Sequence, residues 1–336
     1  MISKLKNPYL IFIGDTDDTS SAKTGAGIIK WCPELVAGQL RFEGNDFDLG
    51  VPNLTIDEAV EKGVKSIIIG VAPVGGRVGP DWIEVLTEAA NLGLDIVSGL
   101  HMRLEEFSEL VDASKKSGAS LINVRTPSKN LPIGSGIKRA GNRLLMVGTD
   151  CAVGKKYSAL AIDKAMKARG IDSTFRATGQ TGMMISGEGE PVDSVISDFI
   201  SGAAETISPG NKDGHWDVIE GQGSLFNPSY SGVSMGLLHG SQPDAFVLCH
   251  EPGREICCSG PEVLIPSLQD CIDLHISCGK IVSPDIKCVG ISLNTSGMSD
   301  DDRKSYITKI QGELSLPCID PIIDGPDAII DFMKID

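Results

Sequence analysis

The sequence lacks the features that mark several specialised classes of protein. No uninterrupted apolar stretch approaches the roughly 20 residues that span a bilayer, so we expect no transmembrane helix. The nine cysteines include no C-x-x-C spacing, which argues against a zinc site, and their odd number argues against a disulfide framework. We find no internal repeat and no low-complexity segment. The pattern predicts an ordinary globular protein with reduced thiols and no bound metal.

Positive charge is also scarce. Thirty lysine and arginine residues stand against 45 aspartate and glutamate residues, which gives a formal net charge of −15. A nucleic-acid partner is therefore not expected, because phosphate backbones demand a basic surface. Any anionic ligand must instead meet a local cluster of cations, and Lys155 and Lys156 form such a cluster.

The N-terminus has little resemblance to an export signal. Two lysines precede a short apolar run, but that run ends at Gly14 and Asp15 without a small-residue cleavage site. The run reads better as a first β-strand, and we expect a cytoplasmic protein.

Apolar runs alternate with helix-like segments along the whole chain. At 336 residues the chain is too long for one ordinary core, so two domains are expected. In the first half, the predicted strands are 9–15, 35–41, 66–73, 95–101 and 120–125. Helical spacing lies between them, at 21–31, 56–64, 81–92 and 104–117. This rhythm predicts a parallel, doubly wound sheet.

A second series follows a linker at 126–142, which contains proline, glycine and serine. Its predicted strands are 143–148, 173–178, 216–221, 244–249, 288–294 and 318–323. The fold class is therefore α/β with two doubly wound domains, at 1–130 and 131–336.

Residues 143–160, RLLMVGTDCAVGKKYSAL, have the layout of a phosphate-binding loop. An apolar strand meets a glycine-bounded turn, and Lys155 opens a helix predicted over 155–169. A helix N-terminus offers unpaired N–H groups and partial positive charge to an anion. We therefore expect a phosphorylated ligand to be held by Gly148, Thr149, Asp150, Cys151, Ala152, Val153, Gly154, Lys155 and Lys156.

The loop departs from the usual nucleotide-hydrolase pattern in two ways. Five residues separate Gly148 from Gly154, one more than usual, and Lys156 stands where a serine or threonine would hold magnesium. The departure indicates phosphate binding without a metal. Cys151 lies near the helix N-terminus, which can lower a thiol pKa. A covalent acetyl-cysteine is one interpretation, and a small residue filling a tight turn is the other.

Glu220 lies at the carboxyl end of a predicted strand, where α/β sheets bind ligands. In an ATP-using enzyme this carboxylate would hold magnesium, whereas in an acyltransferase it would accept a proton from an amine. Capping of a neighbouring loop is the structural alternative. Gly221 and Gly223 flank Gln222 and would let the backbone approach a ligand.

Other polar side chains also follow predicted strands. Arg176 and Gln180 could bind a carboxylate or phosphate, as could Arg254, although either arginine could simply balance the acidic surface. His250 is a second possible general base, or a structural histidine. Asn294 is placed to read a purine edge, or is a plain loop residue.

The P-loop resembles that of another enzyme family. GTDCAVGKK is similar to the longer P-loop of dethiobiotin synthetase, and EGQG and ISLN stand where that family has its acidic and adenine-reading segments. This resemblance implies a ligase or kinase that depends on magnesium and ATP. A third possibility is a non-catalytic sensor of CoA or nucleotide.

A closer resemblance covers essentially the whole chain. It is to a family catalogued as a P-loop domain of unknown function, with a Rossmann-like N-terminal domain and a C-terminal domain similar to P-loop NTPases. The shared motifs are the GD…AKT…G segment (Gly14, Asp15 and 22–25) and GTDCAVGK, ATGQTG, EGQGSL, GLLHGSQPDA and CHEP. Members of the family include D-glutamate N-acetyltransferases, which act in D-glutamate breakdown before an oxidising partner.

The resemblance implies an acyltransferase that moves acetyl from acetyl-CoA to the amino group of D-glutamate. Coenzyme A carries phosphates that can bind without metal, and Lys156 would replace the charge of magnesium. Glu220 or His250 would take the proton from the amine. The two substrate carboxylates would contact Arg176, Gln180, Gln222 and Arg254, and Asn294 would contact adenine. We also expect a homo-oligomer.

Overall fold

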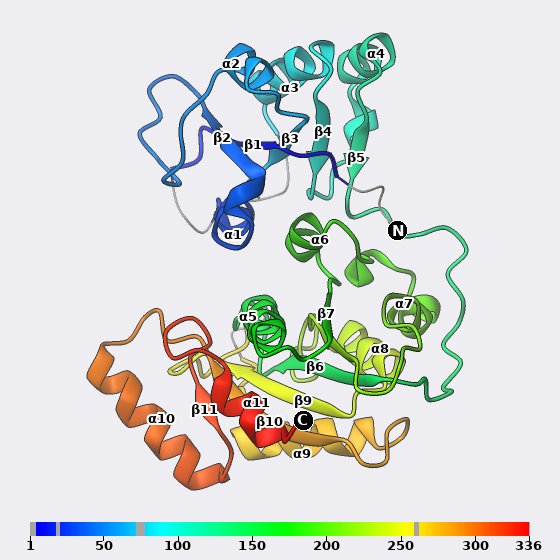
Figure 1. Ribbon diagram of the computed structural model, residues 1–336, viewed down its shortest axis with the longest axis vertical. Helices are drawn as coiled ribbons and strands as arrows, with labels where there is room; N and C mark the ends of the chain where they lie inside the picture. The colour runs from blue at the N-terminus through cyan, green and yellow to red at the C-terminus, as the bar shows by residue number, and fades with distance from the viewer. Residues whose placement is uncertain (1–4, 18–20, 72–77, 259–261, 336) are drawn as a thin grey trace. The chain divides into compact units, whose positions relative to one another are not determined.

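The computed structural model describes residues 5–17, 21–71, 78–258 and 262–335 (Figure 1). The chain divides into two compact units: Met1–Pro127 with Met183–Pro191, and Ser128–Gly182 with Val192–Asp336. Each unit has its own parallel sheet, and the predicted fold class is confirmed. The segment Met183–Pro191 groups with the first unit although it follows the P-loop in sequence.

The first unit carries a five-stranded sheet in the order β2-β1-β3-β4-β5, with every pair parallel. The strands are β1 (Tyr9–Gly14), β2 (Val36–Arg41), β3 (Ser66–Ile69), β4 (Asp95–Ser98) and β5 (Leu121–Asn123). The helices are α1 (Lys23–Trp31), α2 (Ile56–Glu61), α3 (Pro80–Asn91) and α4 (Ser108–Ser117). All five predicted strands are present, although the part of the third at 72–73 lies outside the described residues.

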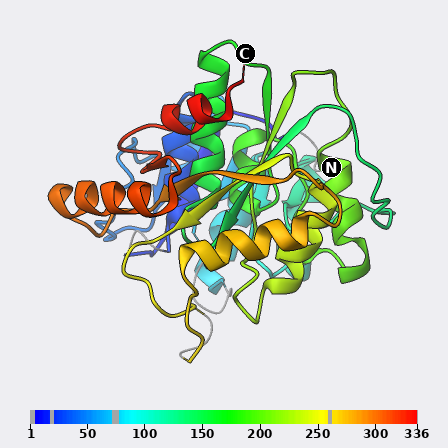
Figure 2. The same cartoon turned by 90° about the horizontal axis from the view of Figure 1, so that it is seen from below.

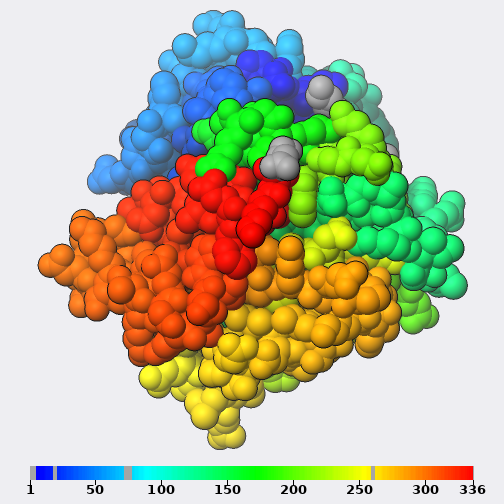
Figure 3. Space-filling model, turned by 60° about the horizontal axis from the view of Figure 1, so that its bottom comes forward, coloured from blue at the N-terminus to red at the C-terminus, as the bar shows by residue number. Residues whose placement is uncertain are grey.

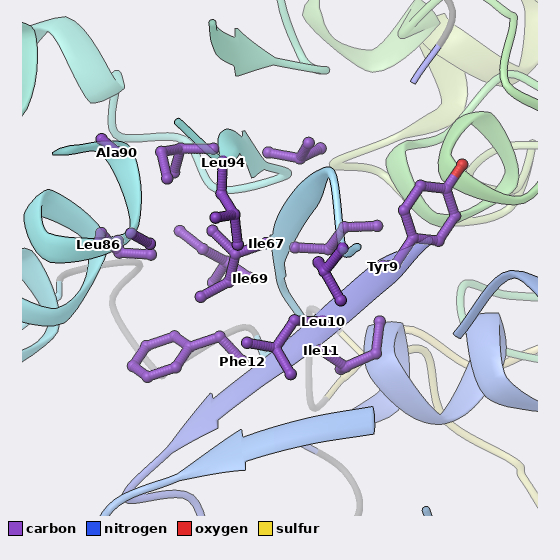
Figure 4. Packing of buried hydrophobic residues seen from close by; sticks show 14 of the residues in the cluster. Tyr9, Leu10, Ile11, Phe12, Ile67, Ile69, Leu86, Ala90 and Leu94 are labelled. Carbon is purple, nitrogen blue, oxygen red and sulfur yellow. The ribbon is translucent and has the colours of Figure 1, made fainter. Parts of the chain in front are cut away.

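The core of this unit explains why its strands read as continuous apolar runs. Every residue of β1 is buried, as is every residue of β3. Figure 4 shows Phe12 and Ile67 among side chains of α3, including Leu86 and Ala90. Strands of a parallel sheet are covered on both faces, so no polar side alternates with the apolar one.

The second unit carries a six-stranded sheet in the order β11-β10-β9-β6-β8-β7, again wholly parallel. Its strands are β6 (Asn142–Gly148), β7 (Ser173–Arg176), β8 (Trp216–Ile219), β9 (Ala245–His250), β10 (Lys287–Leu293) and β11 (Cys318–Ile319). Its helices are α5 (Lys155–Ala168), α7 (Ile200–Ile207), α8 (Ser231–Ser241), α9 (Leu268–Gly279), α10 (Asp300–Leu314) and α11 (Asp327–Met333). Helix α6 (Gln180–Ser186) begins in this unit and continues into the first.

Helices cover both faces of the second sheet. Side chains of α8, α9 and α10 share one apolar core with Leu145 and Phe246 of the sheet. Figure 1 draws α5 and α9 on opposite sides of the strands, and Figure 2 shows α9 crossing in front of them. In Figure 3, α9, α10 and the C-terminal segment form one continuous surface of this unit. No helix within the described residues is long and apolar enough to cross a membrane.

The topology brings the polar loops of the second unit to one edge. The central strand β6 pairs with β8 on one side and β9 on the other, so the chain order reverses beside it. Because all six strands run parallel, the residues after Gly148, Ile219, His250 and Leu293 emerge at the same edge. Ligands of open α/β sheets bind at such a reversal point.

Candidate active site

The loop between β6 and α5 adopts a conformation suited to an anion. Ala152 and Gly154 have left-handed backbones, with φ of 58° and 100°. Gly154 precedes the helix and supplies no capping side chain. A phosphate at the N-terminus of α5 would meet the partial positive charge of the helix.

Lys155 lies inside this loop, and its side chain is almost wholly buried. Its Nζ donates to the main-chain carbonyl of Asp150 over 2.8 Å. A methyl group on Gly148 would lie 2.9 Å from this Nζ, and one on Gly221 would lie 2.9 Å from Lys155 Cδ. The two glycines thus leave the space that the lysine occupies. Burial lowers the pKa of Lys155, and a bound phosphate would favour its charged form again.

Asp150 anchors the loop to the chain that follows β9. Its buried carboxylate accepts hydrogen bonds from Asn227 Nδ2 (2.8 Å), from the Cys258 N–H (2.8 Å) and from the Arg254 guanidinium (3.2 Å). Burial alone would raise the pKa of Asp150, but these donors and the Cys151 N–H hold it below its ordinary value. Arg254 also donates to the Cys151 carbonyl over 2.6 Å. Asp150 is therefore an ionised structural anchor.

Thr149 and His250 form a second contact between these segments. Thr149 Oγ1 lies 3.0 Å from His250 Nδ1, and the Thr149 carbonyl accepts from Ser224 Oγ over 3.0 Å. The His250 ring stacks on Tyr306 with a centroid separation of 6.4 Å. Burial, with the nearby Arg254 charge, lowers the pKa of His250 to about 4. The imidazole is therefore neutral at pH 7.

Glu220 lies directly after β8 and is buried. Its Oε2 accepts the main-chain N–H groups of Thr178 (3.0 Å) and Gly179 (3.1 Å). Burial raises the pKa of this carboxyl, although the Lys156 charge and the two N–H groups oppose the shift. Gln222 Nε2 donates to Thr178 Oγ1 over 3.1 Å, which orders the same turn. A fixed carboxyl with a raised pKa is typical of proton-transfer sites.

Lys156, in the loop, interacts electrostatically with Glu220. Its Nζ lies 4.8 Å from the centre of the Tyr157 ring, and its charge favours the ionised form of Glu220. The lysine that takes the position of a magnesium-binding hydroxyl is thus close enough to stabilise the buried carboxylate. Glu220 thus lies within reach of a charge carried by the P-loop.

Comparison with known families agrees with this geometry. Residues 132–330 match the family described as "Domain of unknown function (DUF1611_C) P-loop domain". Residues 41–127 match the family described as "Domain of unknown function (DUF1611_N) Rossmann-like domain". The chain belongs to the DUF1611 family. Both predicted halves, Rossmann-like and P-loop, are confirmed.

Two curated relatives of this chain carry the name of an enzyme. The chain is 45% identical over 327 residues to a protein of Tritonibacter scottomollicae named D-glutamate N-acetyltransferase, covering 97% of this chain and 98% of that protein. A protein of Pseudoalteromonas sp. with the same name has the same identity and coverage. The crystal structure of a DUF1611 family protein from Anabaena variabilis is 31% identical, with a TM-score of 0.87 over 98% of this chain and 100% of that one.

Three other predicted site residues of this DUF1611 chain are Asn294, Gln180 and Arg176. Asn294 lies beside the P-loop, because a methyl group on Gly154 would be 3.8 Å from Asn294 Cβ, and its Oδ1 accepts from Ser296 Oγ over 2.9 Å. Gln180 begins α6 and is partly exposed. Arg176 Nε donates to the buried carboxylate of Asp217 over 2.7 Å. A substrate carboxylate would have to compete with Asp217 for that guanidinium.

Two residues that contact the site, Tyr306 and Cys258, lie outside the sequence motifs and could not be predicted from them. Tyr306 lies in α10, more than 50 residues after His250, and only the packing of the helix on the sheet brings the rings together. Cys258 belongs to an adjacent cysteine pair, which the sequence alone describes as ordinary reduced thiols. Its N–H bond to Asp150 spans 108 positions and depends on how the chain returns after β9.

Proposed function

We propose that this chain is a D-glutamate N-acetyltransferase, which transfers the acetyl group of acetyl-CoA to the D-glutamate amine and releases CoA and N-acetyl-D-glutamate. The observation that carries the proposal is the 45% identity, over 97% of the chain, to two relatives of that name. The site geometry supports it, because a phosphate-binding loop adjoins a buried carboxylate with a raised pKa.

The P-loop would hold the phosphates of coenzyme A. The partial positive charge at the N-terminus of α5 and the Lys155 ammonium would balance the phosphate charge, and the left-handed Gly154 brings no side chain between the backbone and the ligand. Lys156 offers no hydroxyl to magnesium, so we propose that binding needs no metal. Asn294, next to Gly154, is our proposed contact for the adenine ring.

Of the two possible bases, we favour Glu220. A neutral histidine with a pKa of about 4 accepts a proton poorly at pH 7, and His250 Nδ1 already contacts Thr149. Burial raises the pKa of Glu220 and so makes it the stronger proton acceptor of the two carboxylates at the site. Asp150, held ionised by its donors, is better suited to structural work.

The transfer follows from these roles. Glu220 takes a proton from the ammonium of D-glutamate, and the neutral amine attacks the thioester carbonyl to form a C–N bond. The resulting oxyanion collapses, the C–S bond breaks, and CoA leaves as a thiolate that receives a proton. Gln222 and Gln180, both partly exposed, are proposed contacts for the substrate carboxylates. Arg254 is a further proposed contact, and a carboxylate there would share its guanidinium with Asp150 and the Cys151 carbonyl.

The test is an assay of purified protein with acetyl-CoA and single amino acids in the presence of a chelator. We expect thiol release with D-glutamate, much slower release with L-glutamate, and N-acetyl-D-glutamate on chiral chromatography. Release with other amino acids but not with D-glutamate would overturn the substrate. Magnesium-dependent ATP turnover without acetyl transfer would favour the ligase or kinase alternative. Self-association stays a prediction, which light scattering of the same preparation decides.

A further inference from the structure

One thiol in the P-loop and a second beside it take no part in the proposed acetyl transfer. Cys151 is in the loop and partly buried, whereas Cys258 follows β9 and is exposed. Their Sγ atoms and a carboxylate oxygen of Asp150 all lie within 4.8 Å of one another. The N–H of Cys258 donates to Asp150, so its backbone is held beside the loop.

We propose that Cys151 and Cys258 form a reversible disulfide when the protein meets a small-molecule disulfide, and that this bond locks the P-loop. Both are free thiols in the structure. They stand 107 positions apart in sequence, and the Asp150 cluster brings them together without any covalent link.

A metal ion is a weaker explanation for the same three groups. The Asp150 carboxylate already accepts bonds from Asn227, Arg254 and the Cys258 N–H. The Lys155 ammonium also lies on the Asp150 carbonyl, so two cations flank the position that an ion would take. These two positive charges repel a further cation. Thiol–disulfide exchange therefore suits the surroundings better than metal binding does.

The exposure of the two thiols sets the order of the reaction. The thiolate of Cys258 attacks one sulfur of the external disulfide, which forms a mixed disulfide and releases one thiolate. Cys151 then loses its proton to solvent and attacks Cys258 Sγ, which releases the second thiolate. Two protein thiols are oxidised and one external disulfide is reduced. Burial raises the pKa of Cys151 to about 12, so this thiol reacts only with a sulfur already held beside it.

The effect on ligand binding rests on the proposed function. In the structure, Lys155 Nζ contacts the Asp150 carbonyl and Arg254 contacts the Cys151 carbonyl. A phosphate that enters the loop becomes a second acceptor for the Lys155 ammonium beside the Asp150 carbonyl, and we expect the loop to adjust around it. A covalent bond from Cys151 to the segment after β9 opposes that adjustment. We expect the oxidised protein to bind acetyl-CoA about tenfold more weakly, or worse.

The disulfide itself is tested by non-reducing peptide mapping of the full chain after incubation with oxidised glutathione. We expect a peptide that joins Cys151 to Cys258, in wild type and in the control variant Cys278→Ser, which removes a partly buried thiol elsewhere in the unit. Cys258→Ser should lack it, and dithiothreitol should reverse it. Glutathione left on Cys258, or both thiols still free, would overturn the proposal.

The lock is tested by titrating acetyl-CoA into oxidised and reduced wild type. The oxidised form should bind more weakly, and the affinity of Cys258→Ser should not respond to oxidation. Equal affinities of the two wild-type forms would overturn the lock. Failure of the reduced protein to bind acetyl-CoA would count against the proposed function instead, and the peptide map would still decide the disulfide.

Discussion

At the residue scale, two buried carboxylates at one sheet edge are held in opposite electrostatic environments. Asp150 accepts bonds from Asn227, Arg254 and a main-chain N–H, and its pKa is lowered. Glu220 accepts two main-chain N–H groups, yet burial keeps its pKa raised. Groups whose surroundings separate their pKa values in this way divide the work between anchoring and proton transfer.

The role of Glu220 is tested by Glu220→Gln. We expect kcat to fall by about 10²- to 10⁴-fold, because the amide cannot take the proton of the amine. In wild type the rate should rise with pH as Glu220 ionises, and its raised pKa places this limb above the ordinary range of a carboxyl group. The variant should lack that limb. An unchanged rate with the same acidic limb would assign the base to another residue, with His250 the first to examine.

Sequence motifs identify site residues where spacing alone carries the chemistry. Lys155 follows from its position after a glycine turn, and Glu220 from its position after a strand. The contacts of the site residues depend instead on how the chain folds. The N–H groups that bond Glu220 lie 42 and 41 positions away in sequence, and the Tyr306 ring that stacks on His250 comes from another helix. Arg176 is predicted from the sequence as a substrate contact, but no sequence pattern indicates that it pairs with the buried Asp217.

At the element scale, the P-loop differs from that of a nucleotide hydrolase at Lys156. For Lys156→Thr we expect weaker acetyl-CoA binding, by about tenfold, because one cation near the phosphates and near Glu220 is lost. Calorimetric titration in a chelator measures this change. Stronger use of magnesium ATP by the variant would instead indicate that the loop is an impaired nucleotide site.

The turn after β8 depends on a glycine. A side chain at Gly221 would collide with the main-chain carbonyl of Met146 and crowd the stem of Lys155. Gly221→Ala should destabilise the second unit by about 1–3 kcal/mol, as overpacking of a filled site does. Gly232→Ala in α8 is the matched control, since nothing lies within 4 Å of the added methyl. Denaturant unfolding compares them, and equal stability of the two variants would contradict the packing argument.

The elements themselves follow closely from the sequence, because both sheets are parallel and buried. Their strands read as apolar runs, and all eleven expected strands occur. The expected helix at 104–117 is divided into a 3₁₀ turn, Leu104–Glu106, and α4 from Ser108. Phe107 between them has an extended backbone, with φ of −104° and ψ of 108°, which helical spacing does not reveal.

At the scale of the whole molecule, acid should destabilise the second unit through two buried histidines. Burial lowers the pKa values of His250 and His275 to about 4, below the ordinary 6.5. The unfolded chain therefore binds more protons in this window, so stability is lost as the pH falls from about 6.5 towards 4. At pH 5 we expect a loss of about 2 kcal/mol per histidine relative to pH 7.5.

His275→Gln separates this effect from other acid effects. His275 packs against Phe226 and Phe246 and contacts the Cys271 carbonyl. The variant should be less stable at pH 7.5 but lose less stability between pH 7.5 and 5 in urea unfolding. The same loss in variant and wild type would show that His275 takes up no proton on unfolding.

The binding of coenzyme A phosphates by the P-loop is tested most directly by titrating acetyl-CoA into wild type and Lys155→Ala in the presence of a chelator. We expect wild type to bind without metal, Lys155→Ala to bind about 10- to 100-fold more weakly, and S-acetylpantetheine, which lacks the phosphates, to bind both proteins equally weakly. Equal affinity of wild type and Lys155→Ala for acetyl-CoA, or binding that requires magnesium, would contradict this assignment.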